Sequence, residues 1–311
     1  MNLQIQHLLG LEGVSREDIT LILDTADEFY GVLQRDIKVV PTLRGKTVVN
    51  LFYENSTRTK ISFELAEKRL SASPLNFSVS TSSVNKGESL RDTIQNIEAM
   101  KIDMVVVRHP CAGAPYFLTQ CTGAVIVNAG DGLHEHPTQA LLDMMTIRQK
   151  LGRLDGLKVA IIGDIFHSRV ARSNAWGMKA MGMNVTLCGP PTLLPQHTDS
   201  LGVPVTDNID EALDGADVVM LLRVQLERQS SAVFPSEHEY RERYGFDLER
   251  LSRMKKEVVI MHPGPINRGV ELASNVADSE NSVILDQVTN GVAVRMAALY
   301  LLGGGGSEAV R

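Results

Sequence analysis

The chain has 311 residues, which suggests two domains at roughly 150 residues each. Apolar residues make up 43% of the chain and charged residues 22%, a globular composition that excludes a disordered protein. The formal net charge of −6 argues against a general nucleic-acid or anionic-membrane binder. His109–Gly130 lacks Asp, Glu, Lys and Arg but is too polar to span a bilayer.

The three cysteines, Cys111, Cys121 and Cys188, are widely spaced and form no C-x-x-C motif. This pattern disfavours a disulfide framework and a cysteine-based zinc site. Met1–Gly10 has no basic segment followed by an apolar core, so we expect no signal peptide. Reduced thiols and a cytoplasmic location are the simplest interpretation.

Short β-branched runs alternate with helix-like segments along the chain. Val105–Val107 and Val218–Leu222 are continuously apolar, as in strands buried on both faces of a parallel sheet. The alternation predicts an α/β fold of open parallel sheets with right-handed crossovers. In chain order, the predicted strands are Lys46–Phe52, Leu75–Val79, Asp103–Arg108, Ala124–Asn128, Lys158–Gly163, Asn184–Cys188, Asp217–Leu222, Val258–Met261 and Val283–Leu285.

Gly152, Asp155 and Gly156 interrupt the helix that is expected after Pro137. We therefore expect a first domain over residues 1–150 and a second over 151–287, followed by a C-terminal helix at about 288–311. The long polar segment Arg223–Gly245 follows a predicted strand and is typical of a functional loop.

Polar residues that can bind an anion follow six of the predicted strands. Ligands of open parallel sheets bind beyond the carboxyl ends of the strands. In an acidic chain, cations and donors gathered at one sheet edge indicate a small anionic ligand. The segments are Tyr53–Thr59, Arg108–Pro110, Ala129–Gln139, Asp164–Arg169, Arg223–Gln225 and His262–Pro265.

Ser56–Thr59 lies between a predicted strand and an amphipathic helix. Free N–H groups and the helix dipole form an anion site at such a helix start. Arg58 adds a planar guanidinium suited to phosphate. The alternative is an ordinary hydroxyl cap beside an exposed arginine.

His134 and His136 are two residues apart and can be interpreted as metal ligands, as in an amidohydrolase. No other histidine has a supporting spacing, so we expect no metal. A histidine that donates to a carbonyl oxygen is the preferred interpretation, and a structural histidine is the alternative. Between the start of the predicted strand Lys158–Gly163 and Gly177, Gly163 is the only glycine, so the dinucleotide motif is missing and we expect no cofactor.

Four motifs together resemble the carbamoyltransferase family over about residues 7–302. They are Ser56-Thr57-Arg58-Thr59, Arg108-His109-Pro110, His136-Pro137-Thr138-Gln139 and His262-Pro263-x-Pro265. Within the family, Arg223-Val224-Gln225-x-Glu227-Arg228 resembles the branch that uses L-aspartate. The ornithine branch has a Ser-Met-Gly motif and a His-Cys-x-Pro motif, and neither occurs here.

The resemblance implies transfer of a carbamoyl group from carbamoyl phosphate to the amino group of L-aspartate. The products are N-carbamoyl-L-aspartate and phosphate, in pyrimidine biosynthesis. It also implies one domain for each substrate, with the C-terminal helix returning to the first domain.

The resemblance further implies the site residues. Those for carbamoyl phosphate are Ser56, Thr57, Arg58, Thr59, Ser82, Lys86, Arg108, His136, Gln139, Gly264 and Pro265. Those for aspartate are Lys86, Arg169, Arg223 and Gln225. The implied catalytic residues are Arg58, Thr59, Lys86, Arg108 and His136.

Ser82 and Lys86 match a family loop that enters a neighbouring subunit's site, which implies a homotrimer with shared active sites. The sequence does not distinguish whether regulatory chains or a dihydroorotase bind as further partners. Many relatives have Gln where this chain has Glu135, and we expect the Glu135 side chain to point away from the substrate carbonyl. The competing hypotheses are a carbamoyltransferase for another amine, a catalytically silent scaffold and the metal amidohydrolase.

Overall fold

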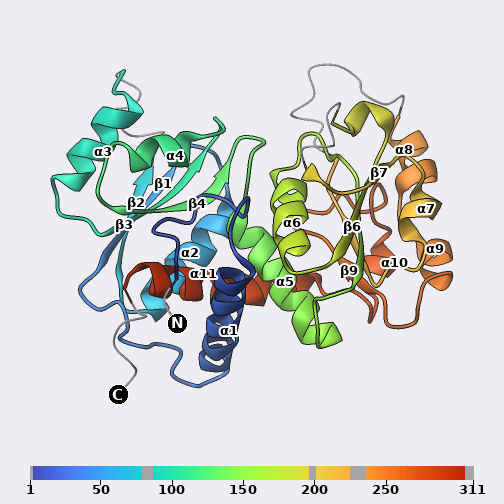
Figure 1. Ribbon diagram of the computed structural model, residues 1–311, viewed down its shortest axis with the longest axis horizontal. Coiled ribbons are helices and arrows are strands. Elements are labelled where there is room, and N and C mark those ends of the chain that lie inside the picture. Colours follow the sequence, from blue (N-terminus) through green and yellow to red (C-terminus); the bar gives the residue numbers. More distant parts are fainter. Residues whose placement is uncertain (1–2, 79–86, 196–200, 225–235, 305–311) are drawn as a thin grey trace. The chain divides into compact units, whose positions relative to one another are not determined.

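The computed structural model describes residues 3–78, 87–195, 201–224 and 236–304. The chain forms two compact units (Figure 1): unit 1 comprises residues 1–145 and 289–311, and unit 2 comprises residues 146–288. The first division falls inside α5 (Pro137–Leu151), before the predicted boundary. The second falls inside the last helix, α11 (Ile284–Leu302), most of which belongs to unit 1.

Unit 1 contains a four-stranded parallel sheet in the order β2-β1-β3-β4. Figure 1 shows α3 and α4 on one face of this sheet, and there Val105 and Ile126 form a core with Ile97 and Leu118. The strands are β1 (Thr47–Phe52), β2 (Ser73–Ser78), β3 (Met104–His109) and β4 (Val125–Asp131). The other helices are α1 (Arg16–Leu33), α2 (Thr57–Arg69), α3 (Leu90–Glu98) and α4 (Ala114–Thr119).

Unit 2 contains a five-stranded parallel sheet in the order β7-β6-β5-β8-β9. Ile162, Leu221 and Ile260 from this sheet share a core with Tyr240. The strands are β5 (Lys158–Ile162), β6 (Asn184–Cys188), β7 (Val205–Thr206), β8 (Val218–Leu221) and β9 (Val259–Met261). The helices are α6 (Arg169–Ala180), α7 (Ile209–Leu213), α8 (Glu237–Tyr244), α9 (Leu248–Ser252) and α10 (Ser274–Ala277), with a 3₁₀ turn at Pro191–Leu193.

The predicted fold class, two open parallel sheets flanked by helices, is confirmed. The predicted strand Val283–Leu285 is wrong. Ser282 makes a single bridge with Ile260, and α11 begins at Ile284. A short apolar run does not distinguish a strand from the start of a buried helix. Strand β7 was not predicted, because two residues are too few to give a pattern.

Most helix starts in the described residues are explained by a polar cap. A side-chain oxygen just before the helix accepts a hydrogen bond from a first-turn N–H, which satisfies one of the donors that have no partner within the helix. Helices α1, α3, α6, α7, α8 and α9 are capped in this way by Ser15, Ser89, Ser168, Asn208, Ser236 and Asp247. None of the helices in this part of the chain is both long and apolar enough to cross a bilayer.

Two polar contacts fix helix α2 within unit 1. Asn50 of β1 donates to Glu67 Oε2 at 2.8 Å, and both residues are fully buried. Arg295 of α11 donates to Ser62 Oγ at 2.8 Å, and its guanidinium lies 5.0 Å from the centroid of the Phe63 ring. Helix α2 is therefore attached both to the sheet and to the C-terminal helix.

The Glu67 contact predicts a pH-dependent stability. Burial raises the pKa of Glu67 to about 7, and the hydrogen bond from Asn50 offsets only part of this rise. A carboxyl group with a higher pKa in the folded chain stabilises the fold at low pH, and this contribution is lost as the pH rises toward 7. Relative to Glu67→Gln, we expect wild type to lose about 2–3 kcal/mol of stability between pH 5 and pH 8.

Unfolding curves of both proteins at pH 5 and pH 8 measure this difference. Glu64→Gln is the matched control, since Glu64 is partly exposed on the same helix and its hydrogen bond with Lys68 lowers its pKa. The control should show no such loss. An equal gap between wild type and Glu67→Gln at both pH values contradicts the prediction.

Candidate active site

In each sheet the strand order reverses at one position, between β1 and β3 in unit 1 and between β5 and β8 in unit 2. The connections of the two strands leave in opposite directions there, which opens a crevice at the carboxyl ends. Ser56–Thr59 follows β1 and Arg108 lies near the end of β3. Arg169 follows β5 and Arg223 follows β8. The Ser56–Thr59 segment and Arg108, Arg169 and Arg223 therefore lie at the two reversal points. His136 and Gln139 instead follow the edge strand β4, and Gly264 and Pro265 follow the edge strand β9.

Helix α2 begins differently from the capped helices. Its N-cap Ser56 has extended backbone angles (φ −159°, ψ 99°), and within the described residues its side chain makes no cap hydrogen bond. The first turn holds no acidic residue. Thr57 and Arg58 are exposed, whereas Thr59 is 8% exposed. The positive end of the helix is thus left for an anion, with an arginine beside it.

Arg108 connects the ends of three strands of unit 1. Its Nε lies 3.3 Å from Glu54 Oε2, and Glu54 follows β1. Its Nη1 donates to the carbonyl of Ala129 in β4 at 3.3 Å, and its own carbonyl accepts from Tyr53 N–H at 2.8 Å. The side chain is 12% exposed. These contacts hold a cation in one orientation at the sheet edge.

His136 is 5% exposed and directly precedes Pro137, the first residue of α5. Its carbonyl accepts from Gln139 N–H at 3.0 Å. The Gln139 amide nitrogen donates to Asp143 Oδ1 at 3.0 Å, one turn further along the helix. The Gln139 amide is therefore oriented by its own helix, with Nε2 assigned as the donor to Asp143.

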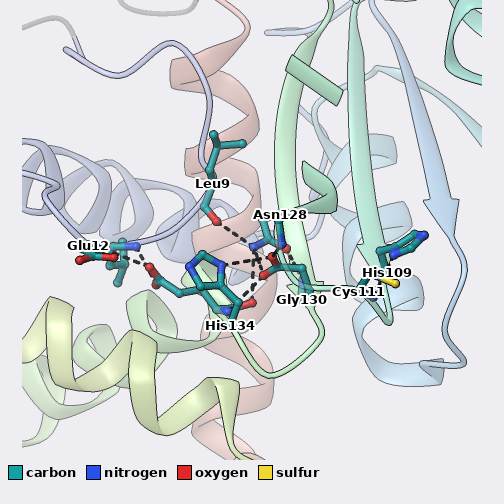
Figure 2. A network of polar contacts seen from close by, with 11 residues as sticks. Leu9, Glu12, His109, Cys111, Asn128, Gly130 and His134 are labelled. Atoms are coloured by element: carbon teal, nitrogen blue, oxygen red, sulfur yellow. Dashed lines mark hydrogen bonds and ion pairs between the residues drawn. The ribbon is translucent and has the colours of Figure 1, made fainter. Parts of the chain in front are cut away.

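The Glu135 carboxylate faces the N-terminal segment. Its carboxylate accepts hydrogen bonds from Leu11 N–H at 2.7 Å and Glu12 N–H at 3.2 Å. This geometry agrees with the expectation that Glu135 points away from a substrate carbonyl. Figure 2 shows Glu12 and His134 within the surrounding polar network.

Among the described residues, Glu12, His134 and Glu135 form the one group of three ligand-type side chains whose atoms lie within 4.8 Å of one another. His136 is not part of this group. Because Glu135 already accepts two backbone hydrogen bonds and His134 Nδ1 lies 3.1 Å from Asp131, the group has a structural explanation.

In unit 2, Arg169 is the first residue of α6 and is 5% exposed. The preceding Ser168 caps this helix through Ala171 N–H at 3.1 Å. A cation at the positive end of a helix is unfavourable for stability, so a functional reason for its position is indicated. Arg223 is half-buried, directly beyond the reversal point.

The loop after β9 is shaped by a buried His–Glu pair. His262 Nε2 lies 3.2 Å from Glu271 Oε1, and His262 Nδ1 accepts from Gly264 N–H at 2.8 Å. Asn267 N–H donates to the same Glu271 oxygen at 2.5 Å, and Asn267 Nδ2 donates to the Val224 carbonyl at 3.4 Å. The segment after Pro265 is therefore joined, through Asn267, to the loop that carries Arg223.

Three predicted residues, Ser82, Lys86 and Gln225, lie outside the described residues. The structure also places two polar residues without a predicted role, Asn128 and Asp131, in the site region. The only sequence signal for them is their position at the end of a buried strand, directly before and directly after Ala129-Gly130.

Residues 6–149 match the family described as aspartate/ornithine carbamoyltransferase, carbamoyl-P binding domain. Residues 155–302 match the corresponding Asp/Orn binding domain. The chain is similar to the aspartate carbamoyltransferase catalytic subunit of Syntrophotalea carbinolica, with 59% identity over 300 residues and 96% of each chain covered. It is also 59% identical over 300 residues to that of Christiangramia forsetii, with 96% of this chain and 97% of the relative covered.

Two solved structures extend the similarity. Aspartate transcarbamoylase from Trypanosoma cruzi in complex with N-(phosphonacetyl)-L-aspartic acid gives a TM-score of 0.86 at 32% identity, with 96% of each chain covered. The catalytic subunit of M. jannaschii aspartate transcarbamoylase gives a TM-score of 0.84 at 33% identity, with 98% of this chain and 100% of that chain covered.

The α2 geometry predicts an effect of Arg58→Ala on anion binding. We expect affinity for inorganic phosphate to fall about 10- to 100-fold, since a hydrogen bond to a charged group contributes about 1.5–3 kcal/mol. Titration calorimetry with phosphate measures this loss. Lys68→Ala is the control, because Lys68 lies in the last turn of the same helix and pairs with Glu64. Unchanged phosphate affinity in Arg58→Ala would refute the assignment.

Proposed function

Because the chain belongs to the aspartate/ornithine carbamoyltransferase family, we propose that its two units bind the two substrates of a carbamoyl transfer. The protein is a transferase that moves the carbamoyl group of carbamoyl phosphate to the amino group of L-aspartate. The observation that carries this function is the placement of Ser56–Thr59 and Arg108 at the reversal point of the first sheet. The proposals below assign the individual residues.

Unit 1 binds carbamoyl phosphate. The phosphate lies at the start of α2, where first-turn N–H groups, the helix dipole and the Arg58 guanidinium all favour negative charge. Ser56 and Thr57 add hydroxyl donors there. The absence of a Ser56 cap bond within the described residues supports this placement, because the helix start is not satisfied by its own side chain.

Thr59, Arg108 and His136 polarise the carbonyl group of carbamoyl phosphate. Negative charge grows on the carbonyl oxygen when the amine attacks the carbon, and each preorganised donor aimed at that oxygen contributes about 10²–10³-fold. The Glu54 and Ala129 contacts support this role for Arg108, because they fix its guanidinium before a substrate arrives. No covalent enzyme intermediate is needed, since phosphate is a good leaving group and takes the proton from the amine.

Gln139 binds the carbamoyl amino group. Its amide nitrogen donates a hydrogen bond to Asp143. Its amide oxygen is therefore the atom that accepts a hydrogen bond from the substrate NH₂. This orientation distinguishes a carbamoyl group, which has NH₂ beside the carbonyl, from an acetyl group, which does not.

Unit 2 binds L-aspartate. Arg169 and Arg223 lie at the reversal point of the second sheet and match the two carboxylates of aspartate in charge. An ornithine side chain is cationic and is repelled by the same arginines. The loop containing Gly264 and Pro265 lines the site, and the His262–Glu271 pair supports it by fixing the loop's backbone. Gln225 and Lys86 complete the aspartate contacts.

The active unit is a homotrimer in which Ser82 and Lys86 of one subunit complete the site of its neighbour. The motif resemblance around these residues supports this assembly. The reaction product enters pyrimidine biosynthesis. We place the protein in the cytoplasm on its cysteine pattern, since Cys111, Cys121 and Cys188 are free thiols.

A colorimetric assay for ureido products, run with carbamoyl phosphate and either L-aspartate or L-ornithine, tests the function. We expect product with aspartate only, because the arginines of unit 2 favour a dicarboxylate. Product with ornithine contradicts the assignment of Arg169 and Arg223. No product with either amine, from a folded oligomer, contradicts the transferase function and favours the silent scaffold.

Mixing two inactive variants tests the shared site. We expect Lys86→Ala and His136→Ala chains to be inactive separately and to regain part of the activity after subunit exchange. Recovery occurs because some mixed sites contain neither substitution. Confirmed mixed oligomers that stay inactive contradict the shared site. Unmixed variants carried through the same exchange protocol are the control.

A further inference from the structure

The loop after β4 is arranged around one buried carboxylate. Asp131, the last residue of β4, is 1% exposed. Its Oδ1 accepts hydrogen bonds from Asn128 Nδ2 at 2.8 Å and from Glu135 N–H at 3.1 Å. Its Oδ2 accepts from Gly113 N–H at 2.7 Å and lies 3.1 Å from His134 Nδ1. A carboxylate has about four acceptor positions, so these contacts use the group fully.

These contacts favour the ionised form of Asp131. Burial by itself raises the pKa of a carboxyl group, but the hydrogen bonds from His134, Gly113 and Asn128 outweigh burial and lower the pKa of Asp131. The hydrogen bond with Asp131 in turn raises the pKa of His134. Charge-assisted hydrogen bonds of this kind are about twice as strong as neutral ones.

The carboxylate joins the loop that follows β3, the strand of Arg108, to the loop that carries His136. Gly113 belongs to the loop after β3, whereas the other three donors belong to β4 or the loop that follows it. Gly132 N–H also donates to the His109 carbonyl at 2.9 Å. The loop after β3 is folded back on itself, because Cys111 N–H donates to His109 Nδ1 at 2.9 Å (Figure 2).

Glu135, the residue directly before His136, makes hydrogen bonds through its backbone N–H, its carbonyl and its carboxylate. Glu135 N–H donates to Asp131 Oδ1, and the Glu135 carbonyl accepts from Asp131 N–H at 3.2 Å. The Glu135 carboxylate is bound by the N-terminal segment, as described above. Asn128 makes a further hydrogen bond to the N-terminal segment, in which its Nδ2 donates to the Leu9 carbonyl at 2.7 Å (Figure 2). His136 therefore starts from a backbone position that these bonds define.

We propose that Asp131 is a positioning residue of the transferase, which sets His136 and Arg108 relative to each other through the hydrogen bonds of its carboxylate. The inference rests on the proposed function of these two residues as donors to the substrate carbonyl. A misplacement of about 1 Å in such donors costs about 10²-fold in rate. Phosphate binding depends on α2, which is fixed separately by Asn50 and Arg295.

Asp131→Asn is the direct test. The amide keeps the size of the side chain but replaces one acceptor oxygen with an NH₂ group, which faces two donors. We expect kcat to fall about 10- to 100-fold. The affinity for inorganic phosphate should change by less than about threefold, a small free-energy difference. This split separates a positioning role from a general loss of structure, which would reduce both quantities.

Asp103→Asn is the matched control. Asp103 directly precedes β3, at the opposite end of the same sheet, and accepts from Lys46 Nζ and Thr47 N–H, both at 2.9 Å. Both substitutions weaken a carboxylate that accepts backbone and side-chain hydrogen bonds, four contacts at the buried Asp131 and two at the partly exposed Asp103, so both should lower the thermal stability. Only Asp131→Asn should lower kcat. His134→Phe removes a single contact of Asp131 from a partly exposed side chain, and it should lower kcat about 3- to 10-fold without affecting folding.

The positioning role of Asp131 is tested by steady-state kinetics, phosphate calorimetry and thermal unfolding. The four proteins compared are wild type, Asp131→Asn, Asp103→Asn and His134→Phe. A kcat for Asp131→Asn within twofold of wild type overturns the inference, as does an equal loss of kcat in Asp103→Asn. If Asp131→Asn does not fold, His134→Phe decides, and wild-type kcat in that variant overturns the inference. A wild-type chain that forms no carbamoyl aspartate overturns the proposed function instead.

Discussion

All strands of a parallel sheet end at one edge, and the helix that follows a strand begins there with its positive end. The rest of the site depends on this constraint. In unit 1 it places Arg108 beside the start of α2, and in unit 2 it places Arg169 and Arg223 beyond neighbouring strands. A chain with a net charge of −6 thereby presents concentrated positive potential to two anionic substrates.

A charged edge binds anions, but catalysis also needs donors that do not move. The structure fixes the donors of unit 1 by two separate sets of buried contacts. Helix α2 is fixed by the Asn50–Glu67 and Arg295–Ser62 hydrogen bonds. The loop before His136 is fixed by the hydrogen bonds of Asp131. In the proposed function, phosphate binding and carbonyl polarisation therefore depend on different parts of unit 1. Such preorganisation means that the protein reorganises little when charge develops on the substrate.

The sequence predicts the fold well because the fold depends on local patterns. Buried strands appear as apolar runs, and Ser56–Thr59, predicted to lie at a helix start after a strand, forms the N-cap and first turn of α2 after β1. Predictions fail where a long-range contact decides the outcome. Val283–Leu285 has a strand-like composition, yet it continues into a long helix. The proposed role of Asp131 rests on its contact with Gly113, 18 residues away, which no local pattern reveals.

A crystal structure of the protein with bound carbamoyl phosphate tests the central claim most directly. The account predicts the phosphate at the start of α2, with its oxygens about 3 Å from first-turn N–H groups and from Arg58. It also predicts the carbonyl oxygen within the same distance of Arg108 and His136. Phosphate bound elsewhere in unit 1, or a carbonyl oxygen that contacts neither residue, would contradict the account.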